Sequence, residues 1–137
     1  MQNRIEEIIL KNLFVSDTFT RKVIPYLEED YFTDRSERLV YKQIGEYFMK
    51  YNECPTHEAL SIQLNDLSGH NDEEIKNALT TINHCKQNTE ETPHEFLVDE
   101  TEKWCKDRAI YNAVMESIQI IDKSSSREKG EIPEILK

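Results

Sequence analysis

The chain has 137 residues, of which 37% are hydrophobic, so it can fill the core of one domain but hardly of two. Its formal charge is −10, and a surface this acidic repels a phosphate backbone, which argues against direct nucleic-acid binding by this segment. No apolar stretch reaches the roughly 18 residues of a membrane span, and the N-terminus lacks the apolar run of a signal peptide, so we expect a cytoplasmic protein without membrane segments.

Apolar residues recur at intervals of three and four along most of the chain, a spacing that predicts an all-α fold. The first helix is expected to bury Ile5, Ile8, Ile9 and Leu13. Ser16 and Asp17 can cap a second helix, which should end or bend near Pro25 because proline lacks a backbone donor. We expect Tyr31 and Phe32 to turn back into the core.

Capping signals predict three further helices in the middle of the chain. Asp34, with Glu37 at capping-box distance, should begin a strongly amphipathic helix that reaches about Tyr51. Pro55-Thr56 breaks the chain and restarts it as a short helix. Asn71 can cap the next helix, which is expected to bury Ile75, Leu79 and Ile82.

A long helix is predicted from Thr92-Pro93-His94-Glu95, which combines a cap residue with an early proline and a well-placed glutamate. Nothing interrupts it before about Lys123, and at ~1.5 Å per residue such a helix spans ~45 Å. Because its apolar stripe outruns the surface that the earlier helices can cover, part of it should meet another chain. The candidate interface residues are Trp104, Tyr111, Met115 and Ile118. Trp104 fits a core position equally well, whereas Tyr111 favours an interface.

These elements suggest one compact multi-helix domain followed by a long helix. The expected segments are a globular helical domain at residues 1–92 and a long hairpin helix at residues 93–123. Residues 124–137 should form a serine-containing linker and then begin a second hairpin helix with Pro133 in its first turn.

No motif for catalysis or cofactor binding is present, so we predict that this segment is not an enzyme and holds no cofactor. Three glycines cannot build a phosphate-binding loop, and no serine or cysteine has the local signature of a nucleophile. The widely spaced cysteines fit free thiols in a reducing compartment. A metal-dependent enzyme stays a remote alternative, because a zinc site can be drawn from Cys54, His57, His84 and Cys85.

Several segments resemble the N-terminal domain of DnaB-type replicative helicases, and they occur in the same order and spacing. They are Glu6–Leu10, Val23–Phe32, Glu37–Ile44, Pro55–Leu60 and Val98–Ile110, the last resembling the first arm of the family's helical hairpin. Gly130-Glu131-Ile132-Pro133 is similar to the phage branch of the family, that of the T-even replicative helicases.

The resemblance implies a non-catalytic collar domain. In this family the N-terminal domains associate through their hairpins into a ring beside the ATPase ring and help to bind primase. The implied partners are therefore further copies of the chain, primase and a helicase loader, with ATP and Mg²⁺ confined to a motor domain outside this segment. The alternative is a free-standing acidic helical regulator, because residues 28–100 hold 17 acidic and only 6 basic residues.

Overall fold

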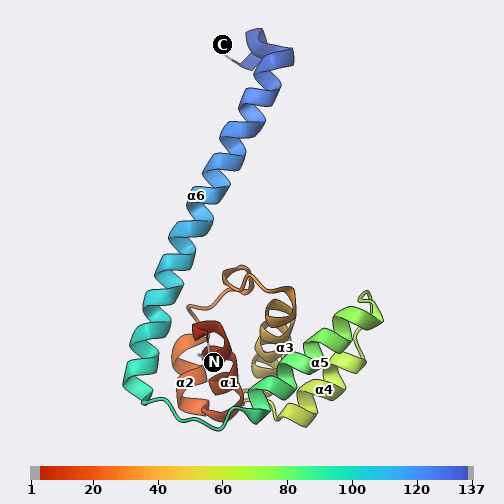
Figure 1. The fold of residues 1–137 in the computed structure, drawn as a ribbon, viewed down its shortest axis with the longest axis vertical. Helices are drawn as coiled ribbons and strands as arrows, with labels where there is room; N and C mark the ends of the chain where they lie inside the picture. Colours follow the sequence, from red (N-terminus) through yellow and green to blue (C-terminus); the bar gives the residue numbers. More distant parts are fainter. Residues whose placement is uncertain (1–3, 136–137) are drawn as a thin grey trace. The chain divides into compact units, whose positions relative to one another are not determined.

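The computed structural model describes the backbone of residues 4–135 and the side chains of residues 4–122. Within that range the chain contains helices and no strand, which confirms the all-α prediction (Figure 1). The elements are α1 (Ile5–Val15), α2 (Asp17–Val23), the 3-10 turn η1 (Glu29–Tyr31), α3 (Arg35–Tyr51), α4 (His57–Asn65), α5 (Asp72–Gln87) and α6 (His94–Ile135). Internal contacts divide the chain into two units, Met1–Cys105 and Lys106–Lys137.

Four helices begin at side-chain caps, each at a position expected from the sequence. A cap side chain satisfies a backbone N–H that the helix itself leaves unpaired. The bonds run from the N–H of Phe19 to Ser16 Oγ (3.2 Å), of Glu37 to Asp34 Oδ2 (3.2 Å), of Ala59 to Thr56 Oγ1 (3.0 Å) and of Glu74 to Asn71 Oδ1 (2.8 Å). Local sequence therefore determines where α2, α3, α4 and α5 start.

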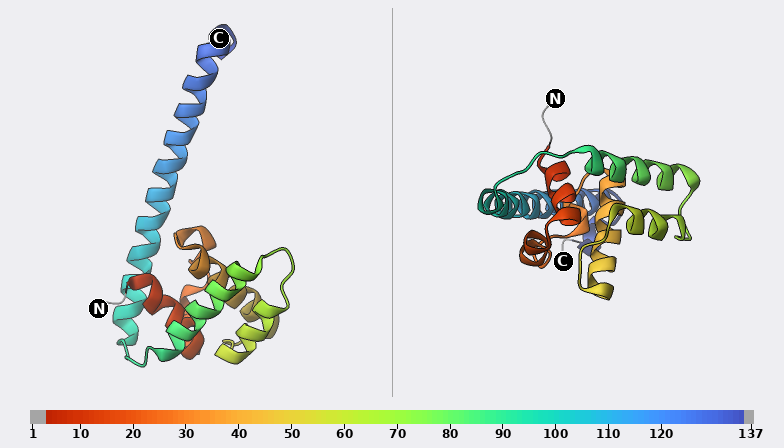
Figure 2. Two further views of the ribbon diagram at one scale, coloured as in Figure 1. Left: turned by 45° about the vertical axis from the view of Figure 1, so that its right-hand side comes forward. Right: turned by 90° about the horizontal axis from the view of Figure 1, so that it is seen from below.

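Helix α3 lies at the centre of the first unit and contacts α1, α4, α5 and η1. Helices α4 and α5 lie side by side across a short loop, and α5 also contacts α1 (Figures 1 and 2). The core between them consists of fully buried aliphatic and aromatic side chains: Ile9, Leu10, Leu13, Phe19, Phe32, Val40, Ile44, Leu60 and Leu64. Burial of each such side chain contributes roughly 1.5–3 kcal/mol, which makes this core the main source of stability.

The chain between α2 and α3 folds back as predicted. Helix α2 ends at Val23, two residues before Pro25, because proline cannot supply the next helical hydrogen bond. Phe32 is fully buried and stacks on Tyr41 with 5.1 Å between ring centroids, and Tyr31 packs partly buried against the core. The expected anchoring role of this aromatic pair is confirmed.

Helix α6 begins at His94, one residue later than expected, and the carbonyl of Pro93 accepts the first helical bond from the Leu97 N–H at 2.9 Å. Its early turns belong to the first unit, since Leu97, Thr101 and Cys105 are buried there. The first unit therefore ends at Cys105, within α6. The domain bounds expected from the sequence, with a globular domain at residues 1–92, stay a prediction.

Residues 124–130, expected as a linker, continue the backbone of α6, which runs to Ile135. No proline precedes Pro133 in this stretch, so nothing removes a backbone donor from the helical ladder there. The side chains from residue 123 onward, and the last two residues of the expected second hairpin helix, lie outside the described part of the structure.

Candidate functional site

The second unit carries an exposed apolar face on α6. It consists of six side chains that are 38–64% exposed: Ile110, Tyr111, Val114, Met115, Ile118 and Ile121. At about 100° per residue these positions fall within an arc of about 140°, so they form one continuous stripe, called here the α6 face. An exposed apolar stripe on a helix is typical of a surface that contacts another molecule. No helix among the described residues is apolar enough over sufficient length to cross a bilayer.

Within the α6 face, Tyr111 contacts the side chain of Arg108. The guanidinium carbon of Arg108 lies 4.6 Å from the centroid of its ring, and Arg108 Nη2 donates to Asn112 Oδ1 at 3.3 Å. A cation held over an aromatic face is attracted by the ring quadrupole, which restricts the ring before any partner arrives. An aromatic side chain restricted in this way is well suited to anchor an interface.

Trp104, the one predicted interface residue that is not part of the α6 face, packs within the first unit. Its ring lies 5.0 Å from that of Phe32 and meets Tyr31 edge-on at 6.1 Å. The side chain is half-buried against the core, so much of its apolar surface is already covered inside the domain. Of the two interpretations that the sequence left open for Trp104, these contacts favour the core position.

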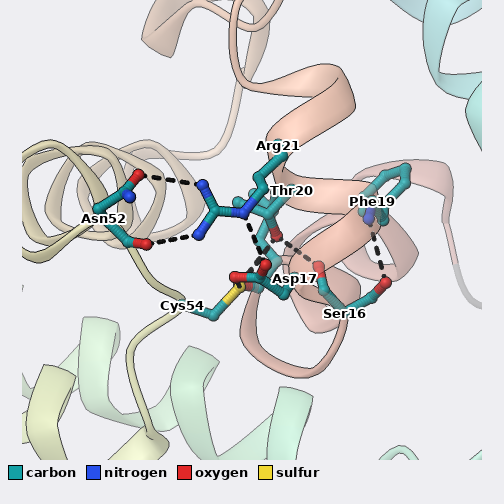
Figure 3. A network of polar contacts seen from close by, with 8 residues as sticks. Ser16, Asp17, Phe19, Thr20, Arg21, Asn52 and Cys54 are labelled. Atoms are coloured by element: carbon teal, nitrogen blue, oxygen red, sulfur yellow. Dashed lines mark hydrogen bonds and ion pairs between the residues drawn. The ribbon is translucent and has the colours of Figure 1, made fainter.

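A polar network fastens the loop after α3 to α2 (Figure 3). Arg21 donates from Nε to Asp17 Oδ2 at 2.6 Å, from Nη1 to Asn52 Oδ1 at 3.0 Å and from Nη2 to the Asn52 carbonyl at 2.6 Å. Asn52 ends α3 in the left-handed conformation with φ 57°, which asparagine tolerates better than most residues. The network orients a helix end and has no free catalytic group, so we assign it a structural role.

The structure does not assemble the zinc site that the sequence allowed as an alternative. The Cys54 thiol donates to Thr20 Oγ1 at 3.2 Å, the His57 ring stacks on Phe14 at 4.4 Å, and Cys85 is buried in the core. Burial raises the pKa of Cys85 to about 12, so its thiolate, the form that binds metals, is strongly disfavoured. Among the described residues no three His, Cys, Asp or Glu side chains are grouped to hold a metal ion, so the remote zinc alternative has no support in this part of the chain.

An ion pair between half-exposed Arg4 and buried Glu37, which the sequence did not reveal, joins the starts of α1 and α3. Arg4 Nη2 donates to Glu37 Oε2 at 2.5 Å, while Glu37 Oε1 is buried without a hydrogen-bond partner and the side chain is only 4% exposed. Burial raises the pKa of Glu37 to about 7; Arg4 opposes the rise, and the carboxylates of Asp34, Glu6 and Glu7 add to it. Glu37 therefore titrates near neutrality.

Sequence spacing had assigned the Glu37 side chain to the capping box of α3. The backbone half of that motif forms, but the carboxylate pairs with Arg4, 33 residues away, instead of the Asp34 N–H. No local pattern marks this partner, because it depends on how α1 packs against α3.

Comparison with known proteins gives one informative similarity. The chain is 32% identical over 114 residues, 83% of its length, to a DnaB-like replicative helicase of Enterobacteria phage T4. It spans 23% of the length of that relative. No protein-family model matches the chain. The similarity confirms the resemblance found in the sequence.

Proposed function

We propose, on the premise that this chain is homologous to one part of a DnaB-like replicative helicase, that it is the non-catalytic N-terminal collar domain of such an enzyme. In this role it mediates subunit association and primase interaction during DNA replication. Long helix α6 then supplies the first arm of the helical hairpin through which the subunits associate.

The observation that carries the proposal is the α6 face. Each of its side chains is roughly half exposed, so covering all six contributes about 6 kcal/mol per chain, from roughly 2 kcal/mol for a whole side chain. Association itself costs roughly 4–15 kcal/mol. Two such faces alone therefore give weak pairing, and a stable ring needs the contacts of a longer chain.

The charge of the first unit supports a role in protein binding rather than in DNA binding. Residues 28–100 carry a net charge near −11, which opposes contact with a phosphate backbone. The proposal accordingly assigns DNA contact, ATP and Mg²⁺ to a motor domain outside this chain. Further copies of the chain, primase and a helicase loader are the proposed partners.

The proposal is tested first in the gene and then in the longer protein. The reading frame after the Lys137 codon should encode a second helical arm and a G-x-x-x-x-G-K-[ST] loop. In that protein, Tyr111→Asp with Ile118→Asp should lower the hexamer fraction in analytical ultracentrifugation and reduce primase stimulation.

The matched control is Ile120→Asp. Ile120 is 58% exposed on the same helix but lies about half a turn around the axis from Tyr111. Ile120→Asp therefore adds one negative charge off the α6 face, as each of the single variants Tyr111→Asp and Ile118→Asp adds one on it. It should assemble normally. If the double variant forms hexamers and stimulates primase as well as this control does, the α6 face is not the association surface.

The alternative, a free-standing acidic regulator, is favoured by the concentration of negative charge in residues 28–100. It predicts a stop codon soon after Lys137 and no phosphate-binding loop in the same frame. Loss of partner binding on adding salt would then be the expected behaviour, since exposed charges are screened over about 8–10 Å at physiological ionic strength.

A further inference from the structure

The first unit has an open apolar groove at the edge of the core, between the segment that links α2 to η1 and helix α3. Its volume is about 1040 Å³. The apolar lining consists of Ile24, Pro25, Leu27, Tyr41, Gly45 and Met49. We call it the Gly45 groove.

Glycine is an unfavourable residue in the middle of a helix, and no contact within the first unit accounts for Gly45. It lies well inside α3, where glycine costs roughly 1 kcal/mol relative to alanine. A Cβ built on it would meet no atom within 4 Å, so no neighbour in this part of the chain requires the missing side chain. Glycine here leaves bare backbone at the floor of the groove, which lets an external group approach closely.

The groove is rigid on one side and adaptable on the other. The Tyr41 hydroxyl donates to the Leu27 carbonyl at 3.2 Å, which ties the α2–η1 segment to α3 and fixes the width of the groove. Met49, one turn beyond Gly45, is 82% exposed. A flexible thioether on an open apolar surface suits contact with a partner side chain.

Charge on the two rims differs. Glu28, Glu29 and Asp30 line the rim at η1, whereas the α3 rim alternates between Lys42, Glu46 and Lys50. Three consecutive acids favour a partner with basic residues on the facing edge, because complementary charge speeds docking and fixes orientation.

We propose that the Gly45 groove docks an amphipathic helix of a partner protein. Apolar side chains of that helix cover Gly45 and Met49, and lysines or arginines along one edge face Glu28–Asp30. A helix fits better than a point ligand because the groove follows α3 from Tyr41 to Lys50, about 13 Å of helix. This inference concerns the first unit alone and is independent of the α6 face and of the helicase assignment.

The test uses a 14-residue Leu/Lys peptide with helical periodicity and a scrambled peptide of the same composition. Amide NMR shifts should appear at Gly45, Met49 and Leu27 with the periodic peptide. Gly45→Leu should weaken its binding at least tenfold by filling the groove, and thermal unfolding should show an intact fold. Met49→Gln, a neutral change at an exposed position, should weaken it as well by removing the apolar thioether. The control Glu58→Gln removes an acid outside the groove and should bind normally.

Three results would overturn the proposal. Shifts spread over every acidic surface would show unspecific attraction to a chain of net charge −10. Equal binding of the scrambled peptide would show that helical amphipathicity is not recognised. Unchanged affinity in both Gly45→Leu and Met49→Gln would place the peptide elsewhere.

Discussion

Replacing Glu37 by glutamine should remove a pH dependence from the free energy of unfolding. Glu37 has a pKa of about 7 in the folded chain against 4.5 as the ordinary value, because it is buried beside other carboxylates. The folded state therefore binds a proton more tightly than the unfolded state. Between these two pKa values stability falls as pH rises, since the native chain must lose a proton that the unfolded chain has already released.

The expected size follows from linkage. The rise of the pKa from 4.5 to about 7 corresponds to roughly 3 kcal/mol at full titration, and most of this is lost between pH 5 and pH 8. Glutamine cannot ionise, so Glu37→Gln should lack this loss and be more stable than the native chain at pH 8. The neutral side chain still offers its amide oxygen to Arg4.

The assay is urea unfolding followed by circular dichroism at half-unit steps from pH 5 to pH 8. The quantity to compare is the difference in stability between the native chain and Glu37→Gln, because His57 contributes with the opposite sign. Burial lowers the pKa of His57, so its contribution to stability grows as pH rises. Glu58→Gln, at an exposed position, serves as the control. A constant difference between native chain and Glu37→Gln across the range would refute the reasoning.

Three further predictions concern single side chains. Asn52→Ala should destabilise the first unit by about 1–2 kcal/mol, because alanine is strained in the left-handed conformation and the hydrogen bond from Arg21 to the Asn52 side chain is lost. Asn52→Gly should lose only that hydrogen bond. Urea unfolding of both variants therefore separates the backbone strain from the hydrogen bond. Trp104→Ala should lower stability by roughly 2–3 kcal/mol while Tyr111→Ala changes it by less than about 0.5 kcal/mol; equal losses would contradict the core assignment of Trp104. In a thiol-reagent time course on the native chain, Cys54 should react first, because the other two cysteines are buried; faster reaction at Cys85 would show that the core opens readily.

The sequence predicted those features that local chemistry decides. Ser16, Asp34, Thr56 and Asn71 each act on a residue three positions ahead, so their roles can be recognised without knowing the fold. The break before Pro25 is equally local. Helix starts and fold class could therefore be derived before the structure.

The features that were missed depend on long-range packing. The Glu37 carboxylate had a plausible local partner, and only the approach of α1 to α3 shows that Arg4 takes it instead. A single glycine in the middle of a helix did not indicate a binding site in the sequence. A role for Gly45 becomes visible only when the α2–η1 segment is seen to form the other side of the groove. By helical spacing Trp104 lies on the same side of α6 as the residues of the α6 face. Only the contact of its ring with Phe32 shows that it belongs to the core, unlike Tyr111.

The local caps have a kinetic consequence. A helix whose first turn is secured by a side chain within four residues can begin to form in about a microsecond, before distant segments meet. The chain then has preformed pieces to assemble, and each of α2, α3, α4 and α5 has such a start. Proteins rich in short-range contacts fold in microseconds to milliseconds, and we expect the first unit to belong to this fast class. The late event in its refolding should be the arrival of α6, whose early turns close over Phe32 only after the other helices have gathered.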